Sequence, residues 1–193
     1  NNQEYYPSDA DFTFFGGIYR DVNIIYLYKT SFAMDDYGSK SLYIKPNPET
    51  GEVEFNTTIS KEDDQNQVKI KYTIYDNSNT QIFQHITAEL DRNTLKNVIQ
   101  TKINGHHLWH GRKDPYLYRL EAELMVKING HFSIVDKVCS NFGFRTMLVN
   151  YDGFFLNGVK YQLRGVSRHQ DRPNKGWAIS NEEEKEDFEL IYE

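Results

Sequence analysis

Residues 118–138 read YRLEAELMVKINGHFSIVDKV, and this stretch decides the fold class. From Tyr118 to Ile128 every second side chain is apolar, while positions 119, 121, 123 and 127 carry charged residues. Such alternation is typical of an antiparallel strand with one buried face and one face in water. Asn129-Gly130 follows at once, a pair favoured in type I′ turns, and a second apolar alternation begins at Phe132. The stretch therefore predicts a β-hairpin.

The same alternation recurs in three other stretches of the chain. The residues that share one strand face in each are Val22, Ile24, Tyr26 and Tyr28; Val53, Phe55, Thr57 and Ile59; and Val68, Ile70, Tyr72 and Ile74. Turn-rich breaks lie between the predicted strands, at residues 35–39, 47–51, 61–66 and 76–79. About seven short strands at this spacing predict a mainly β fold, an immunoglobulin-like β-sandwich of about 110 to 120 residues.

After the predicted sandwich the sequence changes character. Residues 154–161 predict a small hairpin, and residues 162–166 predict a strand that continues from it. A polar loop follows, and Ser180 with Glu183 has the pattern of a capping box that begins a helix. A strand, a loop and a helix in this order predict the first unit of an α/β domain. We expect the helix to continue past the C-terminal residue, because its apolar side begins only at Phe188.

Composition argues against several classes of partner. The 193 residues carry 28 acidic and 22 basic side chains, a net charge of −6, so no broad cationic surface attracts nucleic acid or anionic lipid. No apolar run approaches the roughly 20 residues that a membrane-spanning helix needs. The chain starts at Asn1 without the regions of a signal peptide, so we expect that a leader was removed or that the chain is a fragment, and the compartment cannot be read from this end. We expect a soluble protein, cytoplasmic or periplasmic, of unknown compartment. The single cysteine, Cys139, excludes an internal disulfide and is expected to be buried.

Two polar segments are candidates for a site. His106, His107 and His110 have a spacing that would suit a metal ion on a helix, but turn residues flank them and favour a polar turn between strands. Residues 164–177 are rich in polar side chains and directly follow a predicted strand, where the loops of α/β domains build sites. A solvated loop with Trp177 as a lid on the core is the alternative. The chain has no Gly-rich phosphate loop and no serine in a nucleophile elbow.

Four motifs resemble those of one enzyme family. In chain order they are DFTFFGGIYRDV at 11–22; LW at 108–109 with DPYLY at 114–118; FGFR at 142–145; and FLNG at 155–158 followed by RGVSRHQD at 164–171. Together they are similar to the motifs of family-2 glycoside hydrolases of the β-galactosidase kind. Ser167 and Gln170 depart from the family pattern, in which Asn and Glu are common, and leave His169 in place.

The resemblance implies three parts in an internal fragment of a longer enzyme. Residues 1–28 would be the C-terminal end of a sugar-binding jelly-roll domain. Residues 29–146 would be the immunoglobulin-like β-sandwich. Residues 147–193 would be the truncated start of a TIM-barrel catalytic domain.

The resemblance also implies a chemistry. Family-2 β-galactosidases hydrolyse terminal non-reducing β-D-galactosides with retention, using one Glu as acid and base and a second Glu as nucleophile. Both are expected beyond Glu193, so the fragment alone is expected to be inactive, with no catalytic residue, metal ligand or cofactor of its own. Asp11 and His169 would bind the galactoside substrate. The parent is expected to be a homo-oligomer, and family members often bind a divalent cation such as Mg²⁺ in the barrel.

Two other interpretations stay open. The parent could be a β-glucuronidase or a β-mannosidase, although Arg164 and Arg168 favour a galactosidase. Alternatively, the chain is a free-standing, non-catalytic sandwich module for carbohydrate binding or adhesion, and its C-terminal segment is only a tail.

Overall fold

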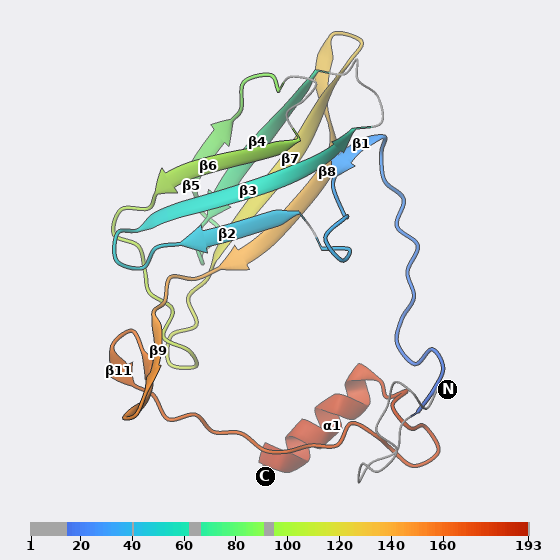
Figure 1. Ribbon diagram of the computed structural model, residues 1–193, viewed down its shortest axis with the longest axis vertical. Coiled ribbons are helices and arrows are strands. Elements are labelled where there is room, and N and C mark those ends of the chain that lie inside the picture. Colours follow the sequence, from blue (N-terminus) through green and yellow to red (C-terminus); the bar gives the residue numbers. More distant parts are fainter. Residues whose placement is uncertain (1–14, 40, 62–66, 91–94, 193) are drawn as a thin grey trace. The chain divides into compact units, whose positions relative to one another are not determined.

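The computed structural model describes residues 15–39, 41–61, 67–90 and 95–192 (Figure 1). The chain divides into two compact units. Residues 26–163 form the larger unit, and residues 15–25 with 164–192 form the described part of the smaller one. The predicted domain ranges 1–28, 29–146 and 147–193 stay predictions.

The larger unit is built on two antiparallel sheets (Figure 1). In the first sheet, β3 (Glu52–Lys61) pairs with β1 (Thr30–Phe32), β2 (Leu42–Pro46) and β6 (Lys96–Lys102). The second sheet has the order β5-β4-β7-β8, with β4 at Val68–Tyr75, β5 at Gln81–Ile86, β7 at Tyr118–Ile128 and β8 at His131–Phe142. The mainly β sandwich predicted from the sequence is confirmed.

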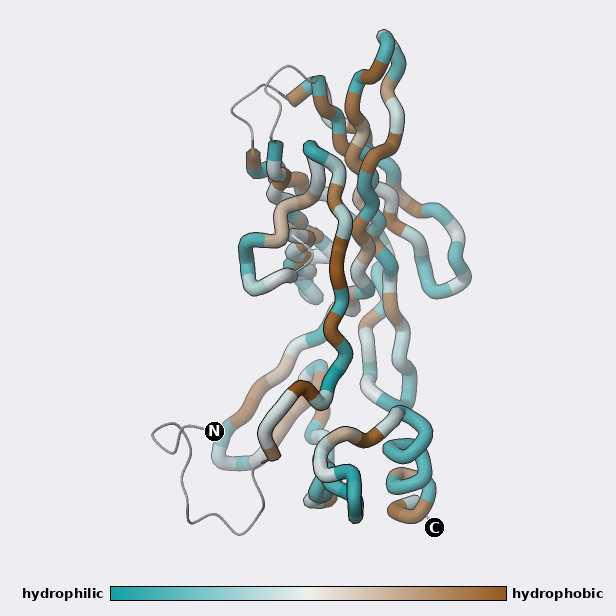
Figure 2. Tube along the Cα trace, turned by 90° about the vertical axis from the view of Figure 1, so that its right-hand side faces the viewer, coloured by the Kyte–Doolittle hydropathy of each residue, from teal (hydrophilic) through white to brown (hydrophobic). Residues whose placement is uncertain are grey.

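The core lies between the two sheets, because each central strand turns its apolar alternate residues inward. Figure 2 shows this alternation of hydrophobic and hydrophilic residues along the chain. The fully buried inner residues include Val53 and Phe55 of β3, Ile70, Tyr72 and Ile74 of β4, and Leu120, Ala122 and Leu124 of β7. Burying each large aliphatic or aromatic side chain stabilises the fold by about 1.5–3 kcal/mol.

One polar contact crosses this apolar core. The Thr57 and Tyr72 hydroxyls are 2.6 Å apart, and the Tyr72 hydroxyl donates to Asn97 Oδ1 at 3.0 Å. Thr57 and Asn97 belong to the first sheet and Tyr72 to the second, so the contact joins the two sheets. Burial raises the pKa of Tyr72 to about 12, because the interior disfavours the charged phenolate.

A second polar contact joins the two sheets at their edge strands, β1 and β8. The pairing of β7 with β8 shifts register between Leu124 and Met125, as in a β-bulge. Next to this irregularity, the Asp136 carboxylate accepts a hydrogen bond of 2.8 Å from the backbone N–H of Phe32 in β1. An edge-strand donor that would otherwise need water is therefore satisfied from the opposite sheet.

The predicted hairpins are present. Asn129 and Gly130, between β7 and β8, have φ angles of 50° and 84°, as a type I′ turn requires. A small sheet follows the sandwich, with β9 at Met147–Asn150, β10 at Gly153–Leu156 and β11 at Val159–Lys160. Asn157 and Gly158 turn the chain between β10 and β11, with φ angles of 50° and 77°. The only described helix, α1, spans Asn181–Tyr192.

Two predicted strands and one predicted burial are wrong. Residues 22–28 and 162–166 form no strand, and Ile24 and Tyr26 are 80% and 91% exposed. Alternation forms a strand only where a partner supplies the ladder hydrogen bonds, and no described strand pairs with these residues. Cys139 is exposed because it lies on the outer face of the edge strand β8, opposite Glu121.

We expect Tyr72→Phe to lower the free energy of unfolding by about 2 kcal/mol, because it leaves the buried Thr57 hydroxyl and the half-buried Asn97 side chain without their partner. Chemical denaturation at pH 8 would measure the change. Tyr75→Phe is the matched control, since the Tyr75 hydroxyl has no hydrogen bond with a described residue and should cost no more than about 0.5 kcal/mol. Equal effects of the two variants would contradict the role of the Tyr72 contact.

The same tyrosine predicts a dependence on pH. Its folded pKa of about 12 lies above the ordinary tyrosine value of 10.0, so its contribution to stability is complete below pH 10 and is lost as the pH rises toward 12. A shift of about two units corresponds to about 3 kcal/mol. The stability advantage of the wild type over Tyr72→Phe should therefore shrink between pH 10 and 12. A constant difference in denaturation midpoint across that range would refute this linkage.

Candidate functional site

Of the two predicted sugar-binding residues, the structure describes one. Asp11 lies outside the described residues. His169 is exposed in the polar loop of residues 164–177, which precedes α1 and contains no helix or strand. The candidate site therefore consists of this loop and the residues of the smaller unit that contact it.

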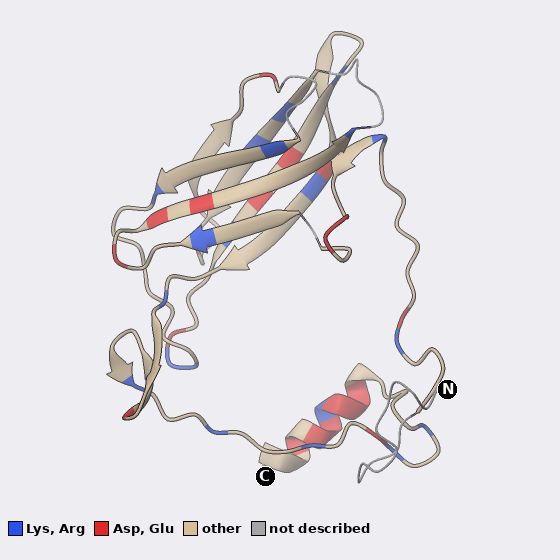
Figure 3. Cartoon of the chain, viewed as in Figure 1, with Lys and Arg blue, Asp and Glu red and all other residues tan. Residues whose placement is uncertain are grey.

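The helix that follows the loop begins as the sequence predicts. The Ser180 N–H donates to Glu183 Oε2 at 2.8 Å, and the Glu183 N–H donates to Ser180 Oγ at 3.3 Å. This reciprocal pair is a capping box. Figure 3 shows that α1 carries mainly acidic side chains along its length, and three of them stand in its first turn. The helix thus presents carboxylates to the loop.

Two arginines bind the loop to these carboxylates. Arg168 donates to Asp187 Oδ2 from Nε at 2.9 Å and from Nη2 at 2.5 Å. Arg172 donates to Asp187 Oδ1 at 2.7 Å, to Glu186 at 2.9 Å and to the backbone carbonyl of Glu183 at 2.7 Å. The hydrogen bonds from Arg172 and Arg168 lower the pKa of Asp187. The arginines therefore hold the loop on both sides of His169.

The N-terminal segment of the smaller unit packs against the end of this loop. The Phe15 and Tyr19 rings contact the Trp177 ring edge-on, with centroid distances of 5.7 and 5.4 Å. Arg20 donates to the Trp177 carbonyl at 2.5 Å and to Gln170 Oε1 at 3.4 Å. Trp177, considered as a possible lid on the core, is instead the centre of this aromatic cluster.

Glycine is required at the contact between the two segments. Gly176 has a φ of 55°, and a Cβ atom there would lie 2.7 Å from the Phe15 ring. Any other residue would clash and would also be strained. The glycine thus permits residues 15–20 and 170–177 to approach closely.

In the larger unit, three of the four motifs converge at one end of the sandwich. Asn157 of the β10–β11 turn accepts a hydrogen bond from the Thr146 N–H at 2.9 Å and donates to the Trp109 carbonyl at 3.0 Å. The Trp109 N–H donates to the Phe144 carbonyl at 2.8 Å. The Arg145 guanidinium lies over the Trp109 ring, 5.1 Å from its centroid. These contacts attach the β9–β11 sheet to the sandwich.

The three histidines of the loop before β7 do not form a metal site. His106 Nε2 is 2.8 Å from the Pro48 carbonyl, His107 Nε2 is 2.5 Å from Asp114 Oδ2, and His110 Nδ1 is 3.2 Å from Asn157. Each ring is engaged separately, and no group of three His, Cys, Asp or Glu side chains in the described residues is arranged to hold a metal ion. The predicted polar turn is confirmed. The divalent cation implied by the resemblance stays a prediction.

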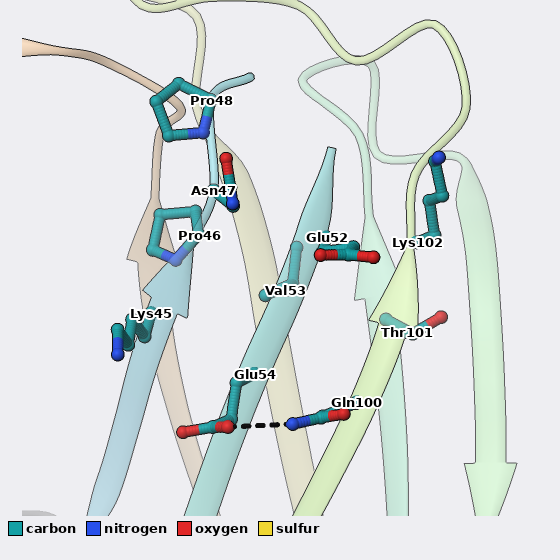
Figure 4. A pocket seen from close by; sticks show the side chains of 10 residues that line it. All are labelled: Lys45, Pro46, Asn47, Pro48, Glu52, Val53, Glu54, Gln100, Thr101 and Lys102. Atoms are coloured by element: carbon teal, nitrogen blue, oxygen red, sulfur yellow. Dashed lines mark hydrogen bonds between the residues drawn. The ribbon is translucent and has the colours of Figure 1, made fainter. Parts of the chain in front are cut away.

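A groove of about 600 Å³ lies over β2, β3 and β6 (Figure 4). The sequence did not predict this groove, because its residues come from separate stretches of the chain.

Among residues 15–192, leaving aside those the structure does not describe, no helix has the length and apolarity that crossing a membrane requires.

Comparison with known proteins identifies relatives of this chain. The chain is 28% identical over 192 residues to a beta-glucuronidase of Bacteroides fragilis, an alignment that covers 97% of the chain and 27% of the relative. It is 32% identical over 190 residues to a beta-galactosidase of Thermoanaerobacterium thermosulfurigenes, covering 94% of the chain and 24% of the relative. The solved structure of Bacteroides uniformis beta-glucuronidase 2 matches with a TM-score of 0.78 and 27% identity, over 99% of this chain and 23% of that one.

The chain thus spans about a quarter of the length of the curated relatives it matches. The family model described as Glycosyl hydrolases family 2 matches residues 40–145, which include most of the sandwich. Because this match covers more than half of the chain, and because the relatives extend it to both ends, the chain belongs to glycosyl hydrolase family 2.

Proposed function

We propose that the chain is part of a retaining β-galactosidase, in which Asp11 and His169 bind the sugar. The observation that carries the proposal is the contact of Arg20 with the Trp177 carbonyl, at 2.5 Å. It joins the segment that follows Asp11 to the segment that follows His169, although about 150 residues separate them in sequence. Two motifs that the resemblance assigns to sugar binding therefore meet in one compact unit.

The chemistry of the two residues suits a neutral sugar. A carboxylate at Asp11 accepts hydrogen bonds from two hydroxyl groups, and His169 donates or accepts according to its tautomer. Such contacts accelerate hydrolysis where they strengthen as the anomeric carbon becomes oxocarbenium-like. The resemblance places the two Glu residues that perform the displacement elsewhere in the whole protein, where one would protonate the leaving oxygen and the other attack the anomeric carbon.

The ion pairs of the loop favour a galactoside over a glucuronide. A glucuronide carries a carboxylate that needs a cationic partner. Arg168 and Arg172 are both bound to carboxylates of α1, and Lys175 is 2.5 Å from Glu183. These three cations near His169 are therefore already paired.

A β-glucuronidase is the second candidate, because several relatives carry that name. The B. fragilis protein and the B. uniformis structure are both described as beta-glucuronidases. Turnover of 4-nitrophenyl β-D-glucuronide above that of the galactoside, by the whole protein that carries this chain, would favour this candidate.

We expect the 193-residue chain alone to show no hydrolysis of 4-nitrophenyl β-D-galactoside, because the resemblance implies that the carboxylate pair of the two-step displacement lies outside these residues. Absorbance of released nitrophenolate, measured against a buffer blank, is the assay. Activity that persists through repurification would show that the pair lies within these residues.

In the whole protein, we expect Asp11→Asn and His169→Phe each to lower kcat/KM for the galactoside by about tenfold or more, or about 1.4 kcal/mol of transition-state stabilisation. Asp35→Asn and His131→Phe are matched controls in the sandwich unit, since Asp35 is exposed in a turn and His131 is exposed at the first residue of β8. Steady-state kinetics would measure all four variants. Unchanged kcat/KM in both test variants would remove the site assignment while leaving the family assignment in place.

A further inference from the structure

The outer face of the first sheet carries a groove that is lined by residues of the larger unit alone. It has a volume of about 600 Å³ and lies over β2, β3 and β6, beside the β2–β3 turn. Ligand sites of small molecules typically have volumes of about 300–1,000 Å³. In Figure 4 the rings of Pro46 and Pro48 stand on one wall, and the side chains of Glu54 and Gln100 meet across the floor.

The rim of the groove is rigid. The Asn47 side chain accepts hydrogen bonds from the N–H groups of Glu49 and Thr50, at 2.9 and 3.2 Å. Gly51, with a φ of 75°, leaves no space for a Cβ atom, which would lie 2.6 Å from the Ile103 carbonyl. The Ile103 N–H also donates to the Gly51 carbonyl at 2.9 Å. The turn is therefore held against the end of β6, and the groove is formed before any ligand arrives.

Some polar side chains of the groove already have hydrogen-bond partners, and others have none among the described residues. Gln100 Nε2 donates to Glu54 Oε2 at 2.9 Å, which orients both side chains and leaves the Gln100 carbonyl oxygen available. Glu52 accepts a hydrogen bond of 3.1 Å from the Thr50 hydroxyl. Lys45 and Lys102 make no ion pair or hydrogen bond with any described residue. The groove therefore offers both acceptors and donors.

The charges of the groove cancel. The lining includes two carboxylates, Glu52 and Glu54, and two ammonium groups, Lys45 and Lys102, so its formal charges sum to zero. A ligand that fits must offer several donors and acceptors without charge, and an apolar face for the proline wall. A pyranose has this composition, because its C–H groups form one face and its hydroxyl groups project around the ring.

We propose that this groove binds a neutral oligosaccharide, with Glu54, Gln100 and Lys102 as its hydrogen-bonding residues. The sandwich would then hold a glycan chain by its own surface, in addition to the sugar contacts proposed for Asp11 and His169. The inference does not depend on those two residues, because it uses only contacts within the larger unit.

Titration of the ¹⁵N-labelled 193-residue chain with β-1,4-linked galactotriose, followed by NMR, tests the proposal. We expect saturable shifts of the amides of Glu54, Gln100 and Lys102, with a dissociation constant of about 5 mM, weak because an open groove buries little of the ligand. Gln100→Ala should raise that constant at least about fivefold, because it removes a hydrogen-bonding amide and releases Glu54.

Gln84→Ala is the matched control, since Gln84 is an exposed glutamine in an edge strand of the other sheet. If Gln100→Ala fails to fold, Lys102→Gln serves in its place, because the Lys102 side chain has no partner to lose within the described residues. Three results would overturn the proposal: no saturable shifts at 20 mM ligand (about four times the expected constant), equal weakening by Gln84→Ala, or tighter binding of the acidic trisaccharide trigalacturonate than of galactotriose.

Discussion

The two sheets of the sandwich are held together by burial of their inner faces, and the Tyr72 hydroxyl determines how those faces meet. A phenol in an apolar core is costly unless it is hydrogen-bonded. Thr57 of β3 and Asn97 of β6 provide the partners. A shift of β4 by one residue would move Tyr72 to the outer face and every neighbouring apolar side chain with it. The contact therefore fixes the position of the second sheet on the first, and all strands that pair with them follow.

The end of this sandwich supports the rest of the larger unit. Tyr118, where β7 begins, stacks on Phe142, where β8 ends, with centroids 5.4 Å apart. Gly143 follows in a place where a Cβ atom would lie 3.1 Å from Trp109, so the loop before β7 packs closely on the strand end. Asn157 then joins that loop to the small sheet. The motifs at 108–118, 142–145 and 155–158 are thus parts of one structural junction.

In the smaller unit, ion pairs hold the loop of residues 164–177 to α1. Single surface ion pairs contribute little, typically less than about 1 kcal/mol. Arg168 and Arg172 instead share the two oxygens of Asp187, and their side chains are only 17% and 24% exposed. Charge-assisted hydrogen bonds that converge on one partly shielded carboxylate are stronger and more directional than a single exposed ion pair. Arg168 and Arg172 therefore hold the loop in position, and the exposed His169 is the side chain that the loop presents.

The sequence by itself determined the elements that depend on neighbouring residues: the β7–β8 hairpin at Asn129-Gly130, the capping box of α1, the polar turn at His107 and the family motifs. The strands that it predicted at 22–28 and 162–166 are wrong, because alternation indicates which face of a strand a residue would occupy and does not supply a partner strand. Only the tertiary structure decided three features: the exposure of Cys139, the contact of Arg20 with Trp177, and the groove at Glu54. Their neighbours come from distant stretches of the chain, and hydrogen bonds and burial depend on distance in space, which local periodicity does not encode.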